Sequence, residues 1–264
     1  MEKEVGRYLF YTFTLTWTFW GGLVILTQFD LLKFGTALSI ILLIPGGLAP
    51  AITVIWLKKK YSSKEEFNSF ISNIKNYRHP LAWYLFTVGL AFVACFLPTL
   101  WGGASMEKPL YLALINLPIM IIGGGLEEIG WRGYLQPTLQ KKWSSFTSTL
   151  IVGGIWAIWH LPLWFIVGSN QMSMNFLWFT VTAMALSFLM TVIYLTTKSI
   201  FLCIIFHALI NSLWEVYIPD TNVLSALFTI LFALVIFTAF DFYRKKKNTK
   251  TQHLKATIVE QERT

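Results

Sequence analysis

The chain has 264 residues, of which 55% are hydrophobic and only 13% are charged, and its mean hydropathy is +0.59. Because soluble globular proteins carry about 25% charged residues, this composition excludes an ordinary soluble domain and indicates a polytopic membrane protein. The net charge of +8 would suit a nucleic-acid binder, but the basic residues lie between apolar segments. We therefore expect them to face anionic membrane lipid, and we expect no nucleic acid partner.

Eight apolar segments are long enough to cross a bilayer, which takes about 20 residues. They cover residues 8–28, 35–57, 81–101, 110–135, 146–168, 173–195, 198–217 and 222–243. When both termini are placed on one side, the lysines and arginines gather there, and only Lys33 and Lys108 fall opposite. The positive-inside rule then puts both termini in the cytosol. The sequence thus predicts an all-α membrane protein with about eight transmembrane helices, N-in and C-in.

The domain organisation follows from the same pattern. Residues 1–243 are predicted to form a single transmembrane domain, with a catalytic core at about 110–217, and residues 244–264 to form a basic cytosolic tail. The longest connection, residues 58–80, carries apolar residues at helical spacing and predicts an amphipathic helix on the cytosolic surface. A basic chain of this topology is typical of a multi-pass protein of the bacterial plasma membrane.

Three charged residues interrupt the fourth apolar segment: Glu127, Glu128 and Arg132. A charge at mid-membrane costs about 2.5–3.5 kcal/mol on insertion scales, so such residues usually pair and mark a functional site. Arg132 follows Glu128 by four residues, which predicts an ion pair on one helix face. Glu127 projects about 100° away and is the candidate general base. The alternative is that all three charges serve only helix packing.

Two histidines also lie within apolar segments. His160 stands one turn after Trp156, and His207 stands one turn before Asn211. Counted from the cytosolic helix ends, these polar residues and Glu128 lie at depths of roughly 14–22 Å. A lone membrane histidine is more often a packing residue than a catalyst. A carboxylate, two imidazoles and a carboxamide at one level, however, are what hydrolysis needs to activate water and to stabilise an oxyanion.

Three motifs on successive helices carry a resemblance to a known family. They read Glu127-Glu128-Ile-Gly-Trp-Arg132, Trp156-Ala-Ile-Trp-His160 and His207-Ala-Leu-Ile-Asn211. They resemble the EExxxR, FxxxH and HxxxN motifs of the CPBP family of intramembrane proteases, which includes the CAAX prenyl endopeptidases and the bacteriocin-processing or self-immunity (Abi) proteins. The resemblance covers about residues 120–215. Trp156 departs from the usual phenylalanine and is expected to form an aromatic wall of the substrate pocket.

The resemblance implies an intramembrane endopeptidase that hydrolyses a peptide bond in a membrane-associated protein or peptide. It implies that Glu127 activates water with the help of His160, while His207 and Asn211 stabilise the oxyanion. Glu128 and Arg132 would be structural support. Nothing in the sequence demands a prenylated substrate.

The sequence leaves open whether a metal is bound and whether the protein has one of two other functions. Members of the family are commonly called metalloproteases, and Glu127, His160 and His207 are candidate zinc ligands, but a metal-free glutamate mechanism needs no further ligand. A non-catalytic bacteriocin self-immunity or scaffold protein would keep the same fold. A small transporter would use the buried carboxylates as proton carriers, although the chain lacks the paired repeats of many transporters.

Overall fold

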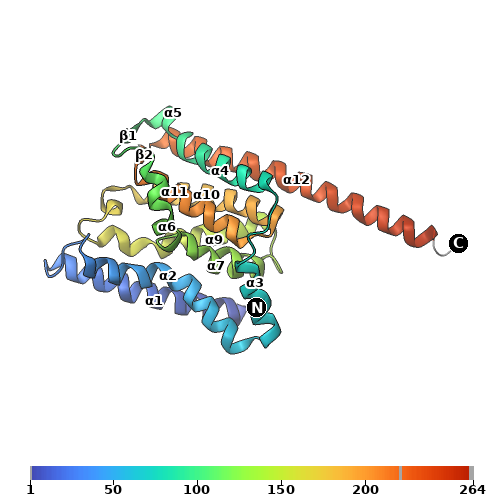
Figure 1. The fold of residues 1–264 in the computed structure, drawn as a ribbon, viewed down its shortest axis with the longest axis horizontal. Helices are drawn as coiled ribbons and strands as arrows, with labels where there is room; N and C mark the ends of the chain where they lie inside the picture. Colours follow the sequence, from blue (N-terminus) through green and yellow to red (C-terminus); the bar gives the residue numbers. More distant parts are fainter. Residues whose placement is uncertain (1, 220–221, 262–264) are drawn as a thin grey trace.

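The computed structural model describes residues 2–219 and 222–261, with side chains up to residue 246. Most of the described chain is helical, and the long helices lie side by side in a bundle (Figure 1). The helices are α1 (Glu2–Gln28), α2 (Ala37–Tyr61), α3 (Lys64–Ile74), α4 (Leu81–Phe96), α5 (Thr99–Gly102), α6 (Leu112–Ile122), α7 (Glu128–Gly130), α8 (Gln136–Leu139), α9 (Ser145–Trp159), α10 (Phe176–Thr197), α11 (Ile200–Trp214) and α12 (Val223–Gln261). Two short antiparallel strands, β1 (Ala104–Met106) and β2 (Tyr217–Pro219), join one end of the bundle.

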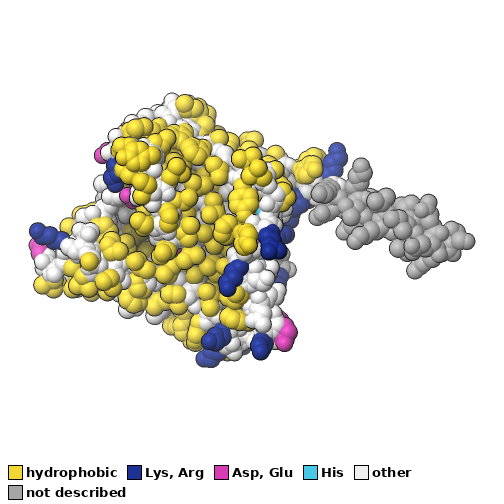
Figure 2. All heavy atoms as spheres, viewed as in Figure 1, with side chains coloured by type: hydrophobic (Ala, Val, Ile, Leu, Met, Phe, Trp, Pro, Cys, Tyr) yellow, Lys and Arg dark blue, Asp and Glu magenta, His cyan; other side chains and the backbone are white. Residues whose placement is uncertain are grey.

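The prediction of an all-α polytopic membrane protein is confirmed. In the described part of the chain, seven helical segments are long and apolar enough to cross a membrane, and α11 is a shorter apolar helix beside them. Figure 2 shows hydrophobic side chains over the middle of the visible face, with lysines and arginines gathered mainly toward one end. The backbone helix of α12 continues past residue 243 into the segment that the sequence assigns to the basic tail.

Contacts between residues far apart in the sequence show which elements lie together at each end of the bundle. At one end Lys142 pairs with Glu2 at 2.8 Å, and Arg244 donates to the Ser145 hydroxyl at 3.2 Å. The short strands lie at the other end, beside the end of α11. The starts of α1 and α9 and the basic end of the α12 span are therefore neighbours, as the predicted N-in and C-in topology requires.

The predicted amphipathic helix is present as α3. Ser63 caps its first turn by accepting a hydrogen bond from the Glu66 backbone N–H, and the Glu66 carboxylate accepts from the Ser63 backbone N–H in return. This capping box satisfies donors that the first turn would otherwise leave unpaired. Phe70 is the buried residue of the helix and belongs to the hydrophobic core.

Helix α11 is mostly buried and contacts α4, α6 and α10. Its 15 residues reach only about 22 Å at 1.5 Å per residue, less than the ~30 Å hydrocarbon core of a bilayer. A helix this short is tolerated because other helices, rather than lipid, surround most of its side chains. It carries His207 and Asn211.

The fourth apolar segment differs from the single continuous span predicted over residues 110–135. Helix α6 ends at Ile122, and a 3-10 turn at Gly125–Glu127, the short α7 and a π-helical turn at Trp131–Leu135 follow. The interruption falls at Gly123 and Gly124, where the chain passes close to α11. Such π-turns are frequent at functional sites.

Candidate active site

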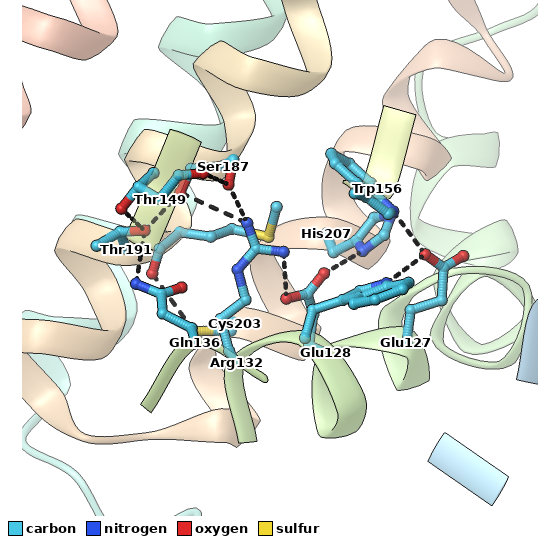
Figure 3. Close-up of polar contacts among 12 residues, drawn as sticks. Glu127, Glu128, Arg132, Gln136, Thr149, Trp156, Ser187, Thr191, Cys203 and His207 are labelled. Carbon is cyan, nitrogen blue, oxygen red and sulfur yellow. Dashed lines mark hydrogen bonds and ion pairs between the residues drawn. The ribbon is translucent and has the colours of Figure 1, made fainter. Parts of the chain in front are cut away.

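The predicted ion pair within the first motif is present. Arg132 Nη1 lies 2.9 Å from Glu128 Oε2, and both side chains are fully buried (Figure 3). Arg132 Nη2 also donates to the Ser187 hydroxyl on α10 at 2.8 Å. The guanidinium thereby joins the first motif to a helix that none of the three motifs includes.

A second polar contact lies one turn further along the same face. Gln136 Nε2 donates to the Thr191 hydroxyl at 2.9 Å, and Thr191 lies 3.0 Å from the Thr149 hydroxyl on α9. Two residues four apart on the charged segment thus face two residues four apart on α10. Sequence reasoning missed these partners, although Ser187 and Thr191 at this spacing in an apolar helix were the signal that could have found them.

Glu128 has a second partner, on α11. Its Oε1 lies 2.9 Å from Nδ1 of His207, which is 4% exposed. The sequence paired Glu128 with Arg132 alone, because an i,i+4 contact can be read locally and a contact between distant helices cannot. The carboxylate holds the imidazole so that its other ring nitrogen, Nε2, lies near Gly124.

Two polar groups of α11 converge on the backbone of Gly124. A Cβ atom added at Gly124 would lie 2.2 Å from Asn211 Nδ2 and 3.2 Å from His207 Nε2. Only glycine allows this approach, because it has no side chain to occupy the space. His207 and Asn211 therefore both lie at the break in the fourth segment, and His207 also contacts Glu128 of the first motif.

This close approach predicts the effect of Gly124→Ala. The added methyl group must push the carboxamide of Asn211 away, and a displacement of about 1 Å in a catalytic site can lower the rate 100-fold. We expect kcat for peptide cleavage in lipid vesicles to fall by roughly that factor. Gly123→Ala is the matched control, because its added Cβ meets nothing closer than the Ile119 carbonyl at 3.4 Å. Equal rates for the two variants would contradict the prediction.

Glu127 points away from the Glu128–Arg132 pair (Figure 3). Its Oε2 accepts hydrogen bonds from Trp156 Nε1 at 2.8 Å and from Trp131 Nε1 at 3.4 Å. The side chain is 4% exposed, and its backbone N–H donates to the Gly124 carbonyl at 3.0 Å. A single turn of chain therefore separates the carboxylate from the backbone that His207 and Asn211 approach.

His160 is the C-cap of α9 and is partly buried. Its Nδ1 donates to the Trp156 carbonyl at 2.8 Å, which leaves Nε2 as the ring acceptor. No hydrogen bond joins it to Glu127 in the described residues. The Trp156 ring instead lies beside both imidazoles, with centroids 5.3 Å from His160 and 5.3 Å from His207. Trp156 itself is buried at 3% exposure.

The candidate zinc ligands do not fit a metal centre. Within the described ranges, no three His, Cys, Asp or Glu side chains lie close enough together to hold a metal ion. Glu127, His160 and His207 thus do not form a zinc site in the described structure, and the proposed reaction uses no metal.

Comparison with known proteins agrees with the motifs. The family model described as type II CAAX prenyl endopeptidase Rce1-like matches residues 108–213, the part of the chain that holds the site. CAAX prenyl protease 2 from Methanococcus maripaludis is 26% identical, over 90% of this chain and 95% of its own. Residues 108–213 are thus similar to the Rce1-like CAAX prenyl endopeptidases, and this similarity supports an intramembrane endopeptidase.

Proposed function

We propose that this endopeptidase hydrolyses its substrate with Glu127 as general base and with His207 and Asn211 as oxyanion donors. The observation that carries the proposal is the geometry at Gly124: the two donors approach its backbone, and the buried Glu127 follows one turn later in the chain. General bases contribute about 10²- to 10⁴-fold to a rate, and an oxyanion donor about 10²- to 10³-fold.

In the proposed reaction, Glu127 takes a proton from water while the water oxygen attacks the scissile carbonyl carbon. Nε2 of His160, the free ring acceptor, would orient the same water. The carbonyl oxygen becomes an oxyanion that accepts hydrogen bonds from His207 and Asn211. When the C–N bond breaks, Glu127 passes its proton to the leaving amine, and the base is restored.

The role proposed for His207 requires protons on both ring nitrogens. Nδ1–H then donates to Glu128, and Nε2–H donates to the oxyanion. The carboxylate of Glu128 balances such an imidazolium, while Arg132 pairs with its other oxygen. The ion pair of the first motif would thus support the site by keeping the oxyanion donor charged and oriented.

Substrates of this site are peptides or proteins, and we propose that they are membrane-associated and that lipid surrounds the enzyme. The relative from Methanococcus maripaludis is named a CAAX prenyl protease, so a prenylated CAAX peptide is the first substrate to test. An unprenylated copy of the same peptide serves as its comparison. Preference for the prenylated copy would support a prenyl-protein substrate, and equal cleavage would support the broader peptide class.

Asn211→Ala tests the proposed oxyanion site. The variant removes one donor and leaves Glu127 in place, so we expect kcat to fall about 100- to 1,000-fold with KM nearly unchanged. Ser212→Ala is the control: it lies next in sequence on α11, is buried, and donates its hydroxyl to the Ala113 carbonyl instead. Mass spectrometry of the cleaved peptide gives both constants. A change in KM alone would exclude Asn211 as an oxyanion donor.

The distribution of basic residues along the sequence supports a cellular location and a membrane orientation for the protein. We propose a multi-pass protein of a bacterial plasma membrane, with the basic loops and the tail at 244–264 against anionic headgroups and without a nucleic acid partner. We further propose that residues 1–243 act as one transmembrane domain whose catalytic core is 110–217.

A further inference from the structure

The carboxylate of Glu127 is held by two tryptophans. Trp156 Nε1 on α9 and Trp131 Nε1 on the π-turn both donate to Oε2. Both indoles are buried. In the described part of the chain these are the hydrogen bonds of this carboxylate, so Oε1 is the oxygen available to water.

The chemistry of indole makes this contact favour the ionised form of the carboxylate. An indole N–H only donates, so it cannot accept a hydrogen bond from a protonated carboxyl group and bonds most strongly to an ionised carboxylate oxygen. A buried charge is costly unless it is hydrogen-bonded, and hydrogen bonds to charged groups are stronger than neutral ones. The two donors thus stabilise the ionised state that a general base needs and fix the plane of the carboxylate.

Trp156 is the stronger of the two donors. Its distance of 2.8 Å is at the short end of the usual N–H···O range, whereas the 3.4 Å of Trp131 lies beyond that range. The Trp156 ring is itself held in place, because it packs against both imidazoles and has the Arg132 guanidinium 5.8 Å from its centre. A phenylalanine would keep these ring contacts but could not donate to Glu127.

We propose that Trp156 is a positioning residue for Glu127: its indole N–H holds Oε2, so that Oε1 faces the attacking water. The inference rests on the proposed role of Glu127 as base. It assigns to Trp156 a function that an aromatic pocket wall does not need, namely the orientation of the carboxylate through one hydrogen bond.

Trp156→Phe is the experiment that tests the inference. The variant keeps an aromatic ring and removes the N–H, so we expect kcat to fall about 10- to 100-fold, as for loss of a hydrogen bond to a charged group. KM should stay within about twofold, because the proposed bond orients the base and does not bind substrate. The measurement is steady-state cleavage of the CAAX peptide by the full chain in lipid vesicles.

Trp159→Phe is the matched control. Trp159 lies on the same helix, is fully buried, and loses a comparable bond of 2.7 Å from its Nε1 to the Thr16 hydroxyl. Thermal unfolding of both variants should show similar losses of stability. Only Trp156→Phe should lose kcat, and equal kcat losses in the two variants would overturn the inference.

A second variant separates this inference from the proposed function. In the Glu127→Gln background, Trp156→Phe should change the remaining rate by less than about twofold, because no base is left to orient. If Glu127→Gln is inactive while Trp156→Phe keeps the wild-type kcat, the positioning role is wrong and the base assignment stands. If Glu127→Gln is fully active, the base assignment itself is wrong.

Discussion

Replacing Glu127 by glutamine is expected to lower kcat by roughly 10³-fold, within the range that general bases contribute. The carboxamide oxygen can still accept the hydrogen bond from Trp156, so the helices around the site should pack as before. The amide cannot take a proton from water at neutral pH, and a 1,000-fold loss corresponds to about 4 kcal/mol of barrier. Mass spectrometry of cleaved CAAX peptide, with purified protein in lipid vesicles, measures the effect.

Glu215→Gln is the control for this substitution. Glu215 follows α11, and its partly exposed carboxylate lies 3.7 Å from the Lys108 ammonium, so its loss should leave the rate unchanged. Wild-type cleavage by the Glu127→Gln variant would mean that another group activates water. The same variant also separates proteolysis from a non-catalytic immunity role, because an immunity protein would still protect cells from its bacteriocin without Glu127.

Replacing Arg132 by methionine is expected to lower the free energy of unfolding by about 3–5 kcal/mol, the usual cost of removing one partner of a buried ion pair. Methionine fills most of the volume but leaves the fully buried Glu128 with His207 as its remaining partner. The Ser187 hydroxyl also loses its donor. Unfolding in mixed micelles of increasing denaturing-detergent content measures the change.

A second substitution distinguishes the unpaired charge from lost packing. Adding Glu128→Gln to Arg132→Met removes the charge, so we expect the double variant to be more stable than the single one. Lys142→Met removes an ion pair with Glu2 whose side chains are 49% and 81% exposed, and it should cost less than about 1 kcal/mol. A double variant no more stable than Arg132→Met would show that the guanidinium acts mainly through packing.

Local patterns in the sequence predicted the features that depend on neighbouring residues. The apolar segments predicted the spans, because length and hydropathy alone decide whether a helix suits a bilayer. The spacing of Glu128 and Arg132 predicted their ion pair. Phe70 and its neighbours predicted α3 because an amphipathic pattern is local too.

Such local patterns could not predict contacts between residues far apart in the sequence. The bond between Glu128 and His207 joins residues 79 apart, and that between Arg132 and Ser187 joins residues 55 apart. The break at Gly124 depends on how closely α11 approaches, which no property of the fourth segment reveals. For the same reason Trp156 was interpreted as a pocket wall, since its N–H has a partner only once α7 and α9 pack together.

The order of these partners along the chain bears on how the protein is made. Ribosomes synthesise Glu128 and Arg132 well before Ser187 and His207, so the charged segment enters the translocon while those partners are still missing. Glu128 and Arg132 are four residues apart and can neutralise each other within one segment, which lowers the cost of insertion at that moment. We therefore expect the ion pair within the first motif to stabilise the segment during membrane insertion, before it takes its place in the folded enzyme.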